Sequence, residues 1–172
     1  MRILLSAAAF SAAGSAQDAV PAYQGPPEDL PREVAPQPIP FSHRLHAEAG
    51  AVCADCHRTA RTGARAGLPD AERCLLCHRA IATESEEVQK LAALAREGLK
   101  IDWVPVYDVP DFVFFSHQRH LAGGVGCVDC HGPVERRDVL AQEISVGMTA
   151  CMNCHRERRA SNECFICHDL GQ

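Results

Sequence analysis

The pentapeptide Cys53-Ala54-Asp55-Cys56-His57 is the first of five C-x-x-C-H motifs in this chain of 172 residues. The other four are Cys74-Leu75-Leu76-Cys77-His78, Cys127-Val128-Asp129-Cys130-His131, Cys151-Met152-Asn153-Cys154-His155 and Cys164-Phe165-Ile166-Cys167-His168. C-x-x-C-H is the attachment sequence of c-type haem. Its spacing lets both sulfurs form thioethers with one porphyrin while the following His binds the iron. The sequence therefore predicts five covalently bound haem c groups.

Two other interpretations of these cysteines exist. C-x-x-C pairs also bind zinc, and cysteines of an exported chain also form disulfides. Neither interpretation explains a His after every second cysteine. All 10 cysteines belong to the motifs, so none is left over. We therefore expect the motif histidines to be proximal iron ligands: His57, His78, His131, His155 and His168.

The composition points to a fold that depends on its cofactors. Aromatic residues make up only 5% of the chain, with 12 Gly and 11 Pro. Five porphyrins would supply the apolar bulk that these side chains do not. We expect a mostly irregular, haem-organised fold with short α-helices and little sheet. The formal charge is −5, and haem propionates would make it more negative, which argues against nucleic acid as a partner.

The N-terminal 40 residues predict export followed by an extended arm. Residues 1–16 resemble a signal peptide, with Arg2, an apolar run and a small-residue cleavage site. An uncleaved N-terminal anchor is the alternative. No other stretch approaches the length of a transmembrane helix, so we expect a periplasmic protein, soluble or peripheral to the membrane. Residues 17–40 are Pro-rich and predict an arm along a partner subunit or a flexible spacer.

An internal repeat divides the rest of the chain. Phe41-Ser42-His43-Arg44-Leu45-His46 and Phe115-Ser116-His117-Gln118-Arg119-His120 stand at the same distance before a C-x-x-C-H motif. We expect two tandem modules, with two haems in residues 41–80 and three in residues 115–172. On a helix, histidines three apart lie on one side, one turn apart. His43, His46, His117 and His120 are therefore predicted distal iron ligands.

Residues 81–114 should join the modules. A helix is predicted with Thr83 as N-cap, Glu86 in a capping box and Gly98 as C-cap. Its apolar stripe, expected to pack on the haem array, is Val88, Leu91, Ala92 and Ala95. In the following segment, 101–114, the aromatic residues Trp103, Tyr107, Phe112 and Phe114 are expected to seal the junction.

The histidine count leaves one iron without a histidine partner. Of 9 histidines, five follow C-x-x-C and four remain for five distal positions. Met148, three residues before Cys151, is the predicted fifth distal ligand. A Met buried for packing, an open iron, or ligation by Lys90 or Lys100 are the alternatives. A Met ligand raises the potential of a haem, so this haem would differ from four bis-His haems.

The F-x-H-x-x-H segment followed by C-x-x-C-H resembles the class III multihaem cytochromes. The resemblance implies that His43 serves the haem of Cys53 and Cys56, and His46 that of Cys74 and Cys77. It likewise implies His117 for Cys127 and Cys130, and His120 for Cys151 and Cys154. Met148 then falls beside the place of the remaining distal ligand, for the haem of Cys164 and Cys167.

A second resemblance is to the pentahaem cytochrome c subunit of alternative complex III, a bacterial quinol-oxidising complex. The similar stretches are 40–43, 66–69, 110–117 and 124–127. This resemblance implies electron transfer from an iron–sulfur or membrane quinol-oxidising subunit to a periplasmic acceptor. Such subunits usually carry a membrane anchor, whereas this chain has only the signal-like segment of residues 1–16.

The function predicted from the sequence is electron transfer without catalysis. No spare His is left as a general base, and no Ser/His/Asp arrangement is visible. A small multihaem reductase with one open haem is the alternative, although no C-x-x-C-K motif occurs. A haem-based sensor is the third, but the chain has no signalling domain.

Overall fold

The computed structural model describes residues 30–33 and 36–169. The predicted signal segment and most of the Pro-rich arm lie outside the described residues. The helices are α1 (His43–Glu48), α2 (Cys53–Cys56), α3 (Ala71–His78), α4 (Glu86–Glu97), α5 (His117–Ala122), α6 (Cys127–His131), α7 (Met148–Glu157) and α8 (Cys164–Cys167). A 3₁₀ turn, η1, covers Val134–Arg136, and β1 (Arg32–Glu33) pairs antiparallel with β2 (Ala141–Gln142). The predicted fold of short helices and irregular chain with little sheet is confirmed at this level.

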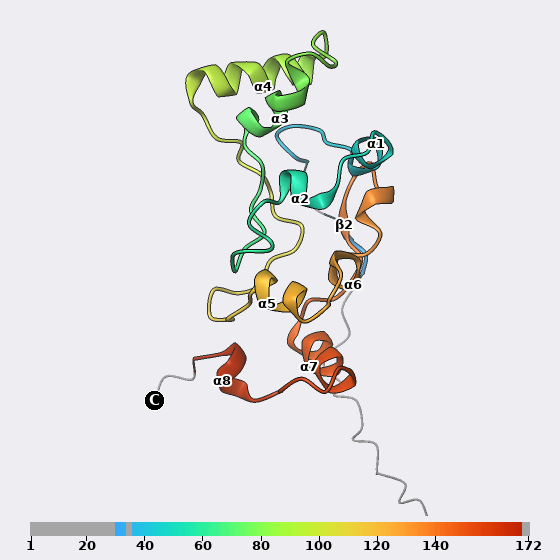
Figure 1. Cartoon of the computed structure of the whole chain (residues 1–172), viewed down its shortest axis with the longest axis vertical. Coiled ribbons are helices and arrows are strands. Elements are labelled where there is room, and N and C mark those ends of the chain that lie inside the picture. The colour runs from blue at the N-terminus through green and yellow to red at the C-terminus, as the bar shows by residue number, and fades with distance from the viewer. Residues whose placement is uncertain (1–29, 34–35, 170–172) are drawn as a thin grey trace, which may run out of the picture.

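The molecule is elongated, and its helices follow one another along the long axis (Figure 1). Helices α3 and α4 lie at one end, α2, α5 and α6 in the middle, and α7 and α8 at the other end. Few apolar side chains are buried within the described part of the chain. They are Ile39, Ala71, Val88, Leu91 and Ile101. Most of the described chain therefore lacks a hydrophobic core made by its own side chains.

Helix α4 begins two residues later than predicted. Its N-cap is Ser85 and not Thr83, and Thr83 Oγ1 donates to the Glu84 carboxylate instead of capping the helix. The reason is the turn before it: Ala82 has φ 55°, and Ser85 N donates to Ala82 O at 3.0 Å. A left-handed residue breaks the helical repeat, so the helix starts only after it. Gly98, with φ 65°, ends the helix as predicted.

Helix α4 packs through part of its predicted apolar stripe, while its contact with the haem array stays a prediction. Val88 and Leu91 are buried, and Leu91 joins Ile39, Ala71 and Ile101 in one core cluster. Cys74, the first cysteine of the second motif, packs against this cluster. Helix α4 therefore covers α3, the helix that carries the second motif (Figure 1).

The described end of the Pro-rich arm packs on the chain itself. β1 pairs with β2, and Gln37 exchanges two hydrogen bonds with the backbone of Val104, at 2.9 and 3.0 Å. Lys90 Nζ donates to Pro38 O at 2.7 Å, and Ile39 is buried. The alternatives of an arm along a partner subunit and a flexible spacer stay predictions, whereas these described residues show intramolecular packing. It follows from Ile39, which removes apolar surface from water by entering the core cluster.

The aromatic segment 101–114 does not form the single cluster that was expected. Trp103 packs on the core cluster and donates from Nε1 to Pro69 O at 2.8 Å. Tyr107 lies on the ring of His131, and Phe112 lies opposite the ring of His168. The segment is extended, so its aromatic rings reach three separate places along the molecule.

Within residues 30–33 and 36–169, no helix has the length and hydropathy that a bilayer crossing needs.

Candidate haem-binding sites

All five C-x-x-C segments lie on helices. They occupy α2, the second half of α3, α6, α7 and α8. In two of them an Asp inside the motif fixes the helix start. Asp55 accepts from Val52 N at 2.9 Å, and Asp129 accepts from Gly126 N at 3.0 Å. These carboxylates satisfy free N–H groups of the first turn, which explains why such short segments become helical.

Six histidines have Nδ1 fixed by a backbone carbonyl. The pairs are His46–Ser42 at 2.7 Å, His57–Gly67 at 2.6 Å, His78–Ile81 at 3.0 Å, His117–Ala64 at 2.8 Å, His120–Ser116 at 2.8 Å and His155–Ser161 at 2.7 Å. A carbonyl only accepts, so Nδ1 carries the proton and Nε2 keeps its lone pair. This is the tautomer that a metal-binding imidazole needs, with its ring oriented by an outer hydrogen bond.

Three of the four spare histidines face a motif histidine. The ring centroids are 6.0 Å apart for His46 and His78, 6.3 Å for His117 and His131, and 6.1 Å for His120 and His155. Two metal–imidazole bonds of about 2 Å, with about 1.1 Å from each nitrogen to its ring centre, span about 6 Å. Each of these three pairs therefore has the spacing for one iron held between its two imidazoles.

His43 is the fourth spare histidine, and its neighbour is His57. Burial, followed by the nearby imidazoles of His57 and His46, lowers the pKa of His43 to about 4. Its Nδ1 is buried without a hydrogen-bond partner. Burial, then His117 and His57, also lowers the pKa of His131. Both rings are thus neutral near pH 7, the form that binds a metal.

Phe41 and Phe115 are site residues whose role the sequence reasoning did not identify. Phe41 stacks on His46 at 4.2 Å and meets His43 edge-on at 4.7 Å. Phe115 stacks on His120 at 4.5 Å and meets His117 edge-on at 4.8 Å. Their place at the start of both repeats was the available signal. Each phenyl ring restricts two imidazoles at once.

The N-caps of α1 and α5 are also alike. Ser42 accepts from Leu45 N at 3.0 Å, and Ser116 accepts from Arg119 N at 3.3 Å. The two F-S-H-x-x-H segments therefore fold in the same local way. The wider division into two modules stays a prediction.

The fifth motif has a different environment. The ring opposite His168 is that of Phe112, at a centroid distance of 5.9 Å and a tilt of 31°. Two contacts hold Phe112 there: an antiparallel bridge between Val113 and His168, and a hydrogen bond from Phe114 N to Cys167 O at 2.8 Å. A phenyl ring has no lone pair to give to iron.

Met148 is the first residue of α7, and its side chain is 53% exposed. On the same helix, burial and then the thiols of Cys130 and Cys167 raise the pKa of Cys151. Cys167 of the fifth motif therefore lies near α7. Met148 stands one turn before Cys151 and projects from the same side of the helix.

Tyr107 organises the third motif from outside it. Its ring meets that of His131 edge-on at 4.6 Å, and its hydroxyl donates to His131 O at 3.2 Å. The same oxygen accepts from Glu143 N at 3.0 Å. Tyr107 thus ties the end of α6 to the segment that follows β2.

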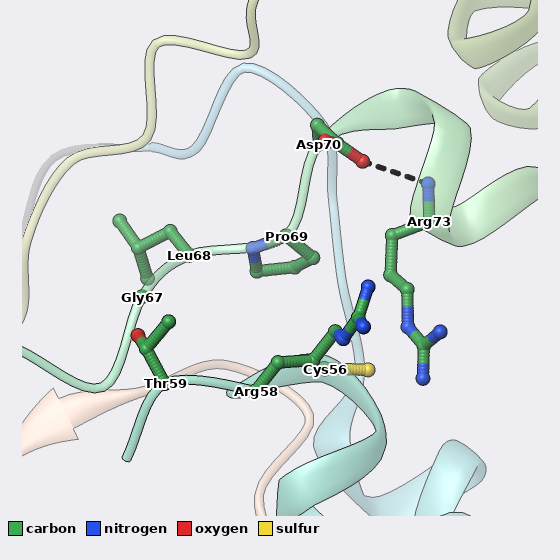
Figure 2. A pocket seen from close by; sticks show the side chains of 8 residues that line it. All are labelled: Cys56, Arg58, Thr59, Gly67, Leu68, Pro69, Asp70 and Arg73. Carbon is green, nitrogen blue, oxygen red and sulfur yellow. Dashed lines mark hydrogen bonds between the residues drawn. The ribbon is translucent and has the colours of Figure 1, made fainter. Parts of the chain in front are cut away.

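A small pocket between the first and second motifs has two arginines and one carboxylate, Asp70, in its lining (Figure 2). Arg58 and Arg73 line it together with Cys56, and Arg73 Nε donates to the carbonyl of Asp55. Burial raises the pKa of Cys56, while the Arg73 guanidinium opposes that rise. These guanidinium groups are suited to neutralise carboxylates such as haem propionates.

The arrangement of cysteines and histidines differs from that of a zinc site or a set of disulfides. All 10 cysteines carry free sulfurs. Nowhere in the described ranges do three or more His, Cys, Asp or Glu gather as a metal site. A tetrahedral zinc site needs such a group, whereas the imidazoles here face each other in pairs.

A comparison with protein families supports the haem interpretation for the C-terminal third. Residues 113–169 match the family model described as cytochrome c7 and related cytochrome c. That family implies covalently bound haem c, several haems in one chain and electron transfer. The class III resemblance is thus confirmed for this part, which contains α5 to α8 and the last three motifs. No curated protein was found to match the chain.

Proposed function

We propose that this chain is a periplasmic pentahaem c-type cytochrome that carries electrons for a quinol-oxidising respiratory complex. The observation that carries the proposal is the set of three imidazole pairs at 6.0, 6.1 and 6.3 Å. Each pair joins one motif histidine to one spare histidine. When bound, haem supplies an iron that takes up and releases one electron.

The protein's own residues hold and tune that iron. The motif cysteines would form the thioethers, and the three facing imidazole pairs would each hold one iron. Carbonyls of Ser42, Gly67, Ser116 and others hold the Nδ1 protons, so the Nε2 atoms stay aimed and basic. At these three sites, imidazole on both sides would leave no position for a substrate, which favours a carrier over an enzyme.

Met148 is proposed as the distal ligand of the fifth haem. The proximity of Cys151 to Cys167 supports this, because Met148 lies one turn before Cys151 on α7. A thioether raises the potential of this haem above those of the bis-His haems. Among the five proposed haems, the one at α8 would then be reduced most readily.

The partners and the compartment are proposed from the sequence. Residues 1–16 support export, and c-type haem is attached outside the cytoplasm. The resemblance to the pentahaem subunit of alternative complex III supports an iron–sulfur or membrane quinol-oxidising donor and a periplasmic acceptor. Peripheral association through that complex fits the lack of a second long apolar segment.

The test begins with the protein purified from a periplasmic extract. Haem quantification and intact mass should give five haems per chain. Electron paramagnetic resonance of the oxidised protein should show low-spin iron throughout. Fewer than five haems would refute the count, and protein confined to the cytoplasm would refute the location. Reduced quinol-oxidising complex should reduce the protein faster than a quinol alone, and equal rates would argue against the proposed donor.

A second function, a small reductase or ligand-binding haem protein, is favoured by one observation. Phe112 lies opposite His168 at a distance close to those of the imidazole pairs. If Phe112 occupies the distal side, the iron has no strong sixth ligand. Carbon monoxide binding by one reduced haem, with high-spin iron and nitrite turnover, would favour this function over the carrier.

A further inference from the structure

The order of the haem sites in space differs from their order in the sequence. The evidence is a series of contacts that join the sites two at a time. The inference rests on the proposed function, because it requires all five motifs to carry haem.

The second and first sites share α1. His46 of α1 faces His78 of the second motif, and His43 of the same helix neighbours His57 of the first. Arg73 of α3 also donates to the carbonyl of Asp55 in α2. These contacts make the first and second sites neighbours.

The first and third sites meet across the boundary between the predicted modules. His117, which faces His131 of the third motif, donates from Nδ1 to Ala64 O at 2.8 Å. Gln118 N donates to Gly63 O at 3.1 Å. Residues 63 and 64 belong to the loop that follows the first motif and fixes His57 through Gly67 O.

The first cysteines of these two motifs also lie close to each other. Burial is the main cause that raises the pKa of Cys53, and the Cys127 thiol, in hydrogen-bonding contact with it, is the next. The first attachment site therefore touches the third.

The third and fourth sites share α5, as the first and second share α1. His117 faces His131, and His120 faces His155. Arg158, just after α7, also forms an ion pair with Asp129 of α6 at 3.0 Å. The third and fourth sites are therefore neighbours.

The fourth and fifth sites are also neighbours in space. His155 Nδ1 donates to Ser161 O at 2.7 Å, and Asn162 Nδ2 donates to Met152 O at 2.9 Å. Both contacts fold the segment before α8 back onto the fourth motif. The nearness of Cys151 to Cys167 agrees with this.

We propose that the five haem sites form one row in the order second, first, third, fourth, fifth. The row follows α3, α2, α6 and α7 along the long axis of the molecule and ends at α8, which lies beside α7 (Figure 1). The second site, under α4, and the fifth site, on α8, are its two ends. Redox partners should exchange electrons at these ends, and the row crosses between the predicted modules at the first and third sites.

The test is two-dimensional nuclear magnetic resonance of the fully reduced, diamagnetic protein. Cross-relaxation peaks between haem substituents should link the second haem to the first, the first to the third, the third to the fourth and the fourth to the fifth. Sequential assignments through the motif cysteines identify each haem. Peaks between the second and third haems, without any between the first and third, would overturn the proposed order.

A matched pair of variants tests the order independently. Cys74→Ser with Cys77→Ser removes an end site, so the peaks that join the other four haems should remain. Cys53→Ser with Cys56→Ser removes the inner site, so the second haem should lose every interhaem peak. A second haem that keeps an interhaem peak in this variant contradicts the row.

The same spectra separate the two proposals. Fewer than five haem spin systems in the wild-type protein would refute the pentahaem assignment itself. Five spin systems with a different connectivity would leave that assignment in place and refute only the order. If the inner-site variant does not fold, the wild-type connectivities alone decide.

Discussion

At the scale of single residues, groups just outside the motifs position the imidazoles that would hold each proposed iron. Backbone carbonyls fix the Nδ1 protons, and a phenyl ring packs on each distal pair. Sites that share the C-x-x-C-H motif therefore differ in the surroundings of their imidazoles. His43 has no partner at Nδ1, and His168 faces Phe112.

Replacing Met148 with His should lower the potential of one haem. A thioether stabilises ferrous iron more than an imidazole does, and axial ligands shift haem potentials within a span of about 0.8 V. Spectroelectrochemical titration should show the highest-potential step move to lower potential while four steps stay. Met152→Leu, inside a C-x-x-C loop, is the control that should leave all five unchanged. Five unchanged potentials in Met148→His would remove Met148 as a ligand.

Phe115→Leu and Phe41→Leu form a matched pair. Leu keeps most of the volume but loses the ring contact with two imidazoles, worth about 1 kcal/mol of unfolding free energy. The g-values of the low-spin signals should change for the third and fourth haems in Phe115→Leu. In Phe41→Leu they should change for the first and second haems. A change in the same haems in both variants would show that the rings act only through general stability.

At the scale of elements, α1 and α5 are the organising helices, since each presents two imidazoles to two different motifs. Helix α1 is anchored to the segment around η1. Arg44 N donates to Arg137 O at 3.0 Å, and Asp138 accepts from Ser42 Oγ at 2.5 Å and from Arg44 Nε at 3.0 Å. This anchor ties the first motif's distal helix to residues that follow the third motif.

Asp138→Asn should make the unfolding free energy less dependent on pH in the acidic range. Hydrogen bonds from Ser42 and then Arg44 lower the pKa of Asp138 in the folded protein. Because the pKa of Asp138 is lower in the folded than in the unfolded protein, its ionised carboxylate stabilises the fold at pH values above the unfolded pKa of about 3.9. This stabilisation is lost as the pH falls through the folded pKa. Denaturant midpoints from pH 6 to pH 2 should therefore fall less in the variant than in the wild type.

Asp111→Asn is the control for this acid effect. Asp111 pairs with Arg65 at 3.5 Å, and its side chain is 100% exposed. An exposed pair of this kind adds little to stability, so the control should follow the wild-type pH curve. Identical curves for Asp138→Asn and Asp111→Asn would contradict the anchoring role of Asp138.

Leu91→Ala should destabilise the α3 end of the molecule. Leu91 is 5% exposed in the core cluster, so its truncation leaves a cavity that costs about 2–4 kcal/mol. Leu99→Ala, at a side chain 53% exposed, should change the unfolding free energy by no more than about 0.5 kcal/mol. Chemical denaturation followed at the haem bands measures both, and equal losses would contradict the core assignment of α4.

At the scale of the whole molecule, the polypeptide supplies little core of its own. The buried apolar side chains of the described residues gather mainly around α3 and α4, while α5 to α8 contribute none. Because residues 113–169 match the cytochrome c7 family model, we expect their fold to depend most on haem for its stability.

Protein made without haem attachment should accordingly be unfolded. Its far-UV circular dichroism should show mostly coil, and its amide proton signals should be poorly dispersed, because backbone ordering costs about 1–2 kcal/mol per residue. Holoprotein at the same pH is the control. A cooperative thermal transition in the haem-free chain would contradict the dependence on haem.

The sequence alone determined what is encoded locally. Attachment of haem involves five consecutive residues, so the number and positions of the proposed haem sites follow directly from the motifs, and the spare histidines from a count. The short helices and the end of α4 at Gly98 were predictable for the same reason. The start of α4 was not, because the conformation of Ala82 decided it.

Only the tertiary structure decided how these local units meet. It placed Phe112 rather than another aromatic ring opposite His168, and it brought the loop after the first motif against His117. These contacts join residues far apart in the chain, where neither spacing nor periodicity carries information. The five motifs are consequently equal in sequence but unequal in space, because contacts between distant segments give each imidazole its neighbours.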